Sequence, residues 1–347
     1  MNGTIYMRHL FLRSAFFCAV IFMNGLLVAI TYDGTSTLSM QATQVTPADT
    51  NDAKGLVWFQ NGFQLPNAGT FSVDIVLPVN GQIDLNGGTL TLARDLYLAS
   101  DATLTDSSGT SASATIDAGG KSIFLSNDLS YSGTTQTLNV ASNLIIDGRG
   151  HMFTIGTSNS IAIAAGATLT LKNMRLALTT TATSPFTVGS NTSTLVLENV
   201  TVGLANDCTW ATGIMVIKGK TVLLGINGTS FINTSTANFT ISSSSCLTLL
   251  DGITYYHNNS GTTNFIMTDN SSRLVLIGAT FQGYNTGSTP LVLTKGMMIV
   301  DHKSYIQPNS AGINVGDGSS SANNLTIVVR PAATIGITAG TFTYADC

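Results

Sequence analysis

The densest group of side chains capable of acid–base chemistry lies at residues 147–151, in the sequence Asp-Gly-Arg-Gly-His. Asp147 could accept a proton, His151 could exchange one near neutral pH, and Arg149 could stabilise a negative charge. A structural interpretation competes with this one, in which Asp147 and Arg149 pair inside a glycine-rich turn. The turn is favoured. Asp147, Arg149 and His151 are therefore the only catalytic candidates, and the sequence predicts no definite catalytic site.

Paired carboxylates would suit glycoside hydrolysis, which needs two carboxyl groups about 5–9.5 Å apart. Asp251 and Asp301 follow equivalent strands of the repeat described below, so we expect them to lie two coils, or about 10 Å, apart. Gly278 stands at the corresponding position between them and interrupts a ladder of acids. We interpret these aspartates as residues that cap turns.

The cysteines provide no metal or redox motif. Outside the first thirty residues they are Cys208, Cys246 and Cys347, and no Cys-x-x-Cys sequence is present. This spacing predicts neither a zinc site nor a thiol redox centre. A disulfide between Cys208 and Cys246 is left open. We expect no cofactor and no bound metal.

The composition excludes several classes of protein. Charged residues make up only 9% of the chain, the net charge is −4, and Glu198 is the one glutamate among 18 acids. A nucleic-acid-binding protein needs a basic patch, and a long coiled coil needs charged outer faces. The hydrophobic content of 44% is too high for a disordered chain. We expect glycans or surface proteins as partners, and no nucleic acid.

The first thirty residues have the layout of an export signal. Arg8 and Arg13 precede an apolar stretch at residues 15–30, which is shorter than the roughly 20 residues of a membrane span. Ala29 offers the best cleavage position, although no clear motif is present, so residues 1–30 are a predicted signal peptide or N-terminal anchor. Residues 31–53 are polar and aperiodic, which predicts a flexible linker. The predicted location is outside the cell, either secreted or on the outer cell surface, with membrane contact only through an uncleaved N-terminal segment.

A repeat of about 26 residues is the strongest signal in the sequence. Two series of short apolar strands alternate with this period, and a shorter third strand follows the first series. The first series begins at Leu144, Leu169, Leu195, Val222, Leu247, Leu274, Met297 and Leu325. The second begins at Ile161, Phe186, Ile214, Phe239, Phe265, Leu291 and Ile313.

A unit with three such strands has too few inward apolar side chains to bury a core alone. If equivalent strands of successive units stack, each backbone group finds a partner in the next coil. The sequence therefore predicts an all-β fold, a single-stranded right-handed parallel β-helix (β-solenoid) of about 26 residues per coil. A propeller blade would need about 40 residues, and a leucine-rich repeat would need a helical segment.

Asn, Gly or Asp follows the first strand at nearly the same offset in successive units. These residue types tolerate a left-handed backbone or cap it with side-chain hydrogen bonds, so we expect them at the bends between walls. They are Asn173, Asn199, Gly225, Asp251, Gly278 and Asp301.

The repeat also suggests a division of the chain. Residues 54–88 are more aromatic than the coils, and an open end of a β-helix exposes strand edges. We interpret residues 54–88 as an N-terminal cap and first coil, and residues 89–347 as the parallel β-helix. The oligomeric state is left open, as is whether Cys347 is the native C-terminal residue.

Residues 81–128 and the phrase at residues 146–151 (Ile-Asp-Gly-Arg-Gly-His) resemble bacterial pectin-lyase-like β-helix proteins. The resemblance covers most of residues 81–337. That superfamily includes polysaccharide lyases, glycoside hydrolases, adhesins and surface proteins of unknown role, so the resemblance implies a fold more than an activity. Polygalacturonases of this type would imply paired aspartates near a Gly-His-Gly phrase, but Met152 follows His151 here.

We expect an exported, surface-displayed or secreted β-helix with a structural or adhesive role, contacting glycans or proteins and without an evident catalytic site. The alternative is a polysaccharide lyase or glycoside hydrolase acting on an acidic polysaccharide. A trimeric module like a tail spike is a third option. The low charge fits the fold, because a repeated charge would face its own copy about 4.8 Å away and repel it.

Overall fold

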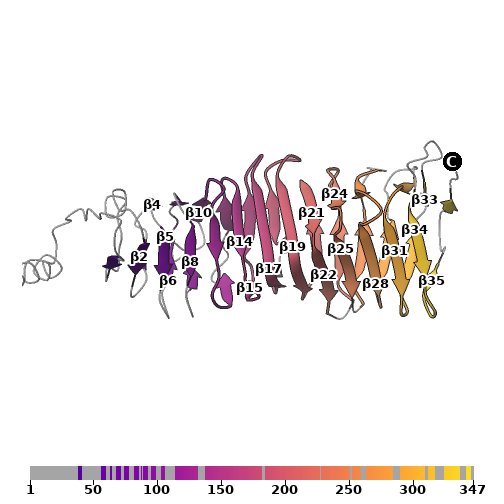
Figure 1. The fold of residues 1–347 in the computed structure, drawn as a ribbon, viewed down its shortest axis with the longest axis horizontal. Helices are drawn as coiled ribbons and strands as arrows, with labels where there is room; N and C mark the ends of the chain where they lie inside the picture. The colour runs from indigo at the N-terminus through magenta and orange to yellow at the C-terminus, as the bar shows by residue number, and fades with distance from the viewer. Residues whose placement is uncertain are drawn as a thin grey trace, which may run out of the picture.

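The computed structural model describes residues 114–131, 137–181, 184–226, 228–250, 252–258, 263–283, 290–308, 312–316, 324–336 and 341–344, together with short strands and single residues between 38 and 105. Every helix or strand assigned within these residues is a β-strand, so none of them forms a helix long and apolar enough to cross a membrane. The strands pair in parallel and wind into an elongated β-solenoid (Figure 1). The predicted all-β parallel β-helix is confirmed.

Three walls form the solenoid, and the chain visits them in a fixed order. The first wall contains β1 (Leu38–Met40), β2 (Leu56–Phe59), β5 (Asp74–Leu77), β8 (Leu96–Leu98), β11 (Ser122–Phe124), β14 (Leu144–Asp147), the first halves of β17 (Thr168–Leu178) and β19 (Thr194–Leu204), β21 (Ile214–Lys218), β24 (Phe239–Ile241) and β27 (Phe265–Met267). It is followed by a separate three-stranded sheet of β30 (Leu291–Leu293), β33 (Ile313–Val315) and β36 (Phe342–Tyr344).

The second wall comes next along each coil. It contains β3 (Phe63–Gln64), β6 (Gln82–Asp84), β9 (Thr103–Thr105), β12 (Leu129–Tyr131), β15 (Met152–Ile155), the second halves of β17 and β19, β22 (Lys220–Gly225), β25 (Cys246–Leu250), β28 (Arg273–Ile277), β31 (Met297–Asp301) and β34 (Thr326–Val329). The long strands β17 and β19 run through the corner between the first two walls, which joins these walls into one large sheet.

The third wall consists of two separate six-stranded sheets. The first contains β4 (Ala68–Phe71), β7 (Thr89–Leu92), β10 (Ala114–Asp117), β13 (Thr137–Val140), β16 (Ser160–Ile163) and β18 (Phe186–Val188). The second contains β20 (Cys208–Trp210), β23 (Ser230–Asn233), β26 (Thr254–His257), β29 (Thr280–Gly283), β32 (Tyr305–Pro308) and β35 (Thr334–Ile335).

Alternate residues of each strand point inward and form one continuous apolar core. Leu144, Leu169 and Leu195 stack in register along the first wall and are buried. Further along, the rings of Tyr255 and Phe281 stack with their centroids 5.3 Å apart. Stacking equivalent side chains supplies the burial that one unit lacks.

The predicted left-handed bends are confirmed at three of the corner positions. Asn173, Asn199 and Gly278 have φ values of 51°, 55° and 63°. At the corner after β31, the positive φ values belong to His302 (46°) and Lys303 (56°), the two residues that follow Asp301. Gly225 does not have a positive φ, and Asp251 lies outside the described residues.

Most of the N-terminal predictions lie outside the described residues, including the whole export segment at residues 1–30. Within residues 31–53, the structure describes only β1, which pairs in parallel with β2. Within residues 54–88, β2 already pairs with β5 in parallel, and β3 pairs with β6 in the same way.

The solenoid has a junction between β18 and β20, where the third wall is interrupted. Leu169 pairs with Leu195, one full repeat later in the sequence, but Leu195 pairs with Met215, which follows it by clearly less than a full repeat. The expectation that equivalent strands always stack is therefore wrong at this step. Val222 pairs with Thr201 of the second wall and not with Leu195 of the first. From this short coil onward, the first strand series lies on the second wall and the second strand series lies on the first wall.

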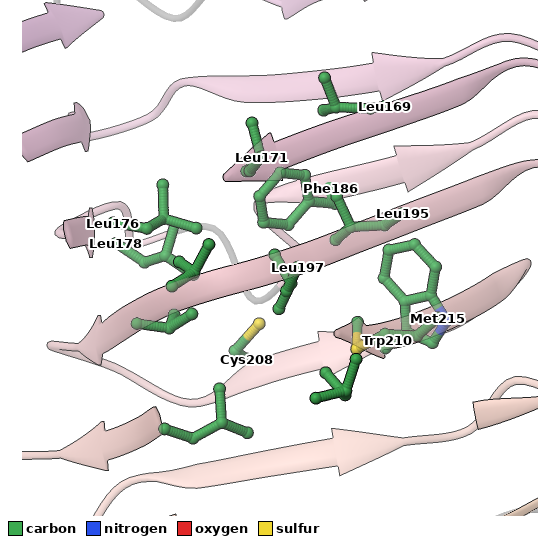
Figure 2. Packing of buried hydrophobic residues seen from close by; sticks show 14 of the residues in the cluster. Leu169, Leu171, Leu176, Leu178, Phe186, Leu195, Leu197, Cys208, Trp210 and Met215 are labelled. Atoms are coloured by element: carbon green, nitrogen blue, oxygen red, sulfur yellow. The ribbon is translucent and has the colours of Figure 1, made fainter. Parts of the chain in front are cut away.

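Trp210 fills the core at this junction. Its side chain is 2% exposed, is one of the core residues drawn in Figure 2, and donates a hydrogen bond from Nε1 to the carbonyl oxygen of Gly213 at 2.9 Å. Gly213 has a φ of 88°, and a Cβ at this position would meet Cγ1 of Val188 at 2.7 Å. The tight bend therefore requires glycine. We call the solenoid before the junction (up to β19) the N-terminal region, and the solenoid from β20 onward the C-terminal region.

Candidate functional site

The three catalytic candidates lie at the corner between the first and second walls, and each has its own partner. Asp147 accepts a hydrogen bond from the backbone N–H of Arg149 at 3.1 Å, and its other oxygen lies 3.5 Å from Nζ of Lys172. Nδ1 of His151 lies 3.9 Å from Asp128. The turn interpretation holds for the backbone of Arg149, whereas the ionic partner of Asp147 is Lys172 from the next coil.

The guanidinium group of Arg149 lies over aromatic rings of earlier coils. Its Cζ is 4.5 Å from the ring centroid of Phe124 and 5.6 Å from that of Tyr97, and these two rings stack on each other at 4.9 Å. Arg149 has a φ of 50°, and the residue before it, Gly148, packs closely against the next coil. This arrangement covers two outward aromatic rings with a cation.

A ladder of charges continues from Asp147 along the solenoid. Asp147 pairs in register with Lys172, Lys172 with Glu198, and Glu198 with Lys218. The sign alternates at every step, so each charge has neighbours of opposite sign about 4.8 Å away. The four residues form a file of structural charges along one corner.

Several other aspartates cap the strand that lies one coil further on. Carboxylate oxygens of Asp95, Asp128 and Asp207 accept hydrogen bonds from the backbone N–H groups of Ser122, Met152 and Ser230, each at 2.8 Å. A short acidic side chain satisfies a donor at the start of a strand with little loss of side-chain entropy. This role gives a physical reason why the acids of this chain are almost all aspartates.

The predicted pair of Asp251 and Asp301 stays untested, because Asp251 lies outside the described residues. Asp301 forms an ion pair with Arg330 at 2.9 Å. Among the described residues, no group of three or more His, Cys, Asp or Glu side chains gathers as a metal site would require.

Cys208 and Cys246 are both free thiols in the structure. Burial raises the pKa of Cys208 to about 12, with a smaller contribution from the charge of Asp207, so this thiol is unreactive at neutral pH. Cys246 is partly exposed and lies on the outer face of the second wall. Cys347 lies outside the described residues.

The outer face of the second wall becomes aliphatic in the C-terminal region. Two files of outward side chains run across β22, β25, β28, β31 and β34. One file is Val222, Thr248, Val275, Ile299 and Val328, and the other is Leu224, Leu250, Ile277 and Asp301. We call the seven aliphatic members the aliphatic face: Val222, Leu224, Leu250, Val275, Ile277, Ile299 and Val328.

These side chains point away from the core, because their strand neighbours are the buried ones. In β28, Leu274 and Leu276 are buried whereas Val275 and Ile277 are partly exposed. All four large hydrophobic residues that are well exposed within the described chain belong to the C-terminal region. Val328 (37%) is on the face, Ile226 (52%) directly follows β22, Tyr305 (43%) begins β32, and Val329 (45%) ends β34.

Sequence reasoning missed this face because it assigned the wrong side of two strands of the second wall to the core. In the strand series that includes Val222 and Met297, the first and third residues of each strand are expected to point inward. In the structure, the middle residues Leu223 and Met298 are the inward ones instead. The available signal was the unbroken apolar run in β28 and β31, which is typical of strands covered on both faces.

Basic side chains border the aliphatic face on both long sides. At the corner with the first wall are Lys218, Lys220, Arg273 and Lys295, and at the corner with the third wall are His302, Lys303 and Arg330. The described acids at or beside these corners are Glu198, Asp207, Asp269 and Asp301. Glu198 lies in register with Lys218, and Asp301 is already paired with Arg330. We call these two groups of basic residues the basic margins.

A shallow polar depression of ≈ 420 Å³ adjoins one margin and is lined by Asp269, Asn270, Ser271, Lys295 and Asn324. Hydrogen bonds from the hydroxyl groups of Ser243 and Ser271 lower the pKa of Asp269 to about 2. Asp269 thus stays ionised and ties neighbouring corners together.

Comparisons with known proteins provide no relative: no family model, curated protein or solved structure matches the chain.

Proposed function

We propose that the chain is an exported β-solenoid with a structural or adhesive role, which acts by holding its aliphatic face against another surface. The observation that carries this proposal is the alignment of seven aliphatic side chains on the outside of five stacked strands. Such a sheet face is costly to leave in water, and contiguous exposed apolar patches mark contact sites.

The strand sequences support the same proposal. Near-continuous apolar runs are typical of strands that are buried on both faces, as in β28 (RLVLI) and β31 (MMIVD). The solenoid core covers the inner face of these strands. A partner surface on the outer face would complete their burial.

The alternative, a lyase or hydrolase acting on an acidic polysaccharide, is supported by the resemblance to pectin-lyase-like proteins. The same resemblance also supports our proposal of an extracellular location. The contacts of the candidate residues favour a structural role over catalysis, because Asp147 is held by Lys172 and Asp128 caps the backbone of Met152. Incubation with pectin and alginate, scored for new reducing ends, tests the enzymatic alternative directly.

The contact role is tested with beads that carry the full chain through a C-terminal biotin tag. Adhesion is measured on films of pectin, gelatin and phospholipid containing phosphatidylserine. The test variant is Leu250→Asn with Ile277→Asn. The matched control is Thr154→Asn with Ala177→Asn, in the same file of the second wall but in the N-terminal region.

We expect adhesion to at least one film, reduced about tenfold or more by the test variant and unchanged by the control. Asparagine stacks well on a solenoid wall, so both variants should fold. Equal losses for the two variants, or adhesion to none of the films, would overturn the contact role.

A further inference from the structure

We propose that the aliphatic face binds the headgroup region of an anionic lipid bilayer. This inference rests on the contact role proposed above and names its partner. Three features of the face support it: the charge of its borders, its area, and the apolar side chains that project beside it.

The charge of the borders favours an anionic partner. Six lysine and arginine residues line the basic margins, against four described acids at or beside them, Glu198, Asp207, Asp269 and Asp301. Lys220 and Arg273 occupy the first positions of β22 and β28 and are exposed. An apolar strip between two rows of cations matches a bilayer surface, where acyl chains lie beneath a layer of phosphate and carboxylate groups.

The same charges disfavour a second copy of the chain as the partner. Two copies that meet face to face are related by a two-fold axis lying in the plane of the contact. An axis along the solenoid places the margin containing Lys220 and Arg273 against the margin containing Lys303 and Arg330. An axis across the solenoid places each margin against itself. Both arrangements bring like charges together at the rim of the contact.

The area of the face also argues against a protein dimer. Five strands about 4.8 Å apart and about five residues long cover roughly 400 Å². A specific protein interface usually buries about 800 Å² on each partner. A lipid surface has no such minimum, because apolar burial and electrostatic attraction to lipid headgroups add together.

Three of the four well-exposed large apolar side chains lie on the face or beside it. Ile226 follows β22 at the corner with the third wall, Tyr305 begins β32 beyond the same corner, and Val328 lies on the face itself. Tyrosine with aliphatic and basic neighbours is the composition of side chains at a membrane–water interface. These residues would enter the headgroup layer before the flatter part of the face does.

The test is co-sedimentation of the full chain with vesicles of phosphatidylcholine alone or of phosphatidylcholine mixed with phosphatidylserine. We expect binding to the anionic vesicles at low salt, weakening as sodium chloride is raised from about 50 to about 300 mM, because salt shortens the range of the attraction. Replacing Lys218, Lys220 and Arg273 by glutamine should weaken this binding by about 100-fold, from about fivefold for each cation. A control with Lys121→Gln and Arg175→Gln, both in the N-terminal region, should bind like the wild type.

Leu250→Asn with Ile277→Asn should weaken binding to anionic vesicles by about tenfold or more, whereas Thr154→Asn with Ala177→Asn should not. Circular dichroism and thermal unfolding establish that each variant is folded. Absence of binding to anionic vesicles, or equal losses in a variant and its control, would overturn the lipid assignment. If a pectin or gelatin film then still binds in a face-dependent way, the contact role stands without lipid. A mass of two chains by light scattering, lost in the Leu250 and Ile277 variant, would assign the face to a second copy instead.

Discussion

The second wall of the solenoid carries different chemistry in its two regions, although the same files of residues run through both. In the N-terminal region, its outward positions are polar, small or flexible. They include Ser130, Met152, Thr154, Arg175, Ala177, Thr201 and Gly203. In the C-terminal region the same files hold the seven residues of the aliphatic face. The inward residues of this wall remain mostly Leu, Ile, Val, Met and Phe in both regions, with Thr221 as a buried polar exception.

This difference distinguishes residues that the fold requires, on the inner face of the wall, from outward residues that the fold does not require. Both regions bury the same kind of core and pair their backbones in the same parallel way, so the fold does not need an aliphatic outer face. Exposing aliphatic side chains to water brings no stability to the solenoid itself. The outward residues of the C-terminal region are therefore the basis of the contact role that we propose.

The junction between the two regions gives the largest expected effect. Trp210→Ala should lower the free energy of unfolding by about 3–5 kcal/mol, because it removes the largest buried side chain at the break in the third wall and leaves a cavity. Urea denaturation followed by circular dichroism measures this loss. Trp210→Phe, which mainly loses the hydrogen bond to Gly213, should cost clearly less. A loss below about 1 kcal/mol for Trp210→Ala would show that the junction is not packed as described.

The alternating charge ladder links the two regions, since it runs from Asp147 in the N-terminal region to Lys218 in the C-terminal region. Lys172→Glu would place three carboxylates in consecutive coils, and we expect a loss of about 1–2 kcal/mol that shrinks at high salt. Lys172→Gln is the matched control and should cost less. Thermal unfolding at two salt concentrations measures both. Equal losses for the two variants would contradict the ladder.

The comparison can also be reversed by transferring aliphatic residues to the N-terminal region. Thr154→Val with Ala177→Leu extends the chemistry of the face along the same wall. If the outward residues determine contact, bead adhesion should rise severalfold, while thermal stability should change little, because both positions are on the outer surface. An unchanged adhesion would show that the aliphatic residues are not sufficient.

The smallest effect is expected at Asp269, next to one basic margin. Hydrogen bonds from Ser243 and Ser271 lower its pKa from 3.8 to about 2. Because the folded-state pKa is depressed, the associated stability is present above about pH 4 and is lost as the pH falls towards 2. The melting temperature of Asp269→Asn should therefore fall less between pH 4 and 2 than that of the wild type. A parallel decline of the two proteins would contradict this account.

Much of the fold could be predicted from the sequence, because the repeat indicates the length of each coil and the number of its strands. The repeat alone places Leu144, Leu169 and Leu195 in one stack, and it places Asn173 and Asn199 at left-handed bends, as the structure confirms. The shift by one wall at the junction could not be predicted. The period of about 26 residues continues through the junction. Only the short spacing between the paired strands β19 and β21 reveals that strands there pair with members of a different series.

The candidate site was harder to predict for a related physical reason. In strands such as β14 (LIID), alternation identifies the inward residues, but in β22 and β31 apolar residues occupy both faces. Composition then cannot distinguish the two sides, and a shift of one residue exchanges them. The group at Asp147, Arg149 and His151 stands out in the sequence because charged residues are rare in this chain, although the contacts at that corner are structural.

The most direct test of the central claim compares two probes on the same wall. Cys18 and Cys347 are replaced by serine in both proteins. In the first protein, an environment-sensitive fluorophore is attached to Cys246 on the outer surface of β25. In the second protein, which carries Cys246→Ser and Ala177→Cys, the same fluorophore is attached at position 177 in the N-terminal region. Emission is recorded before and after the addition of vesicles of phosphatidylcholine mixed with phosphatidylserine. We predict a blue shift for the probe at Cys246 and none for the probe at position 177. Equal shifts at both positions, or a shift at position 177 alone, would contradict the assignment of contact to the aliphatic face.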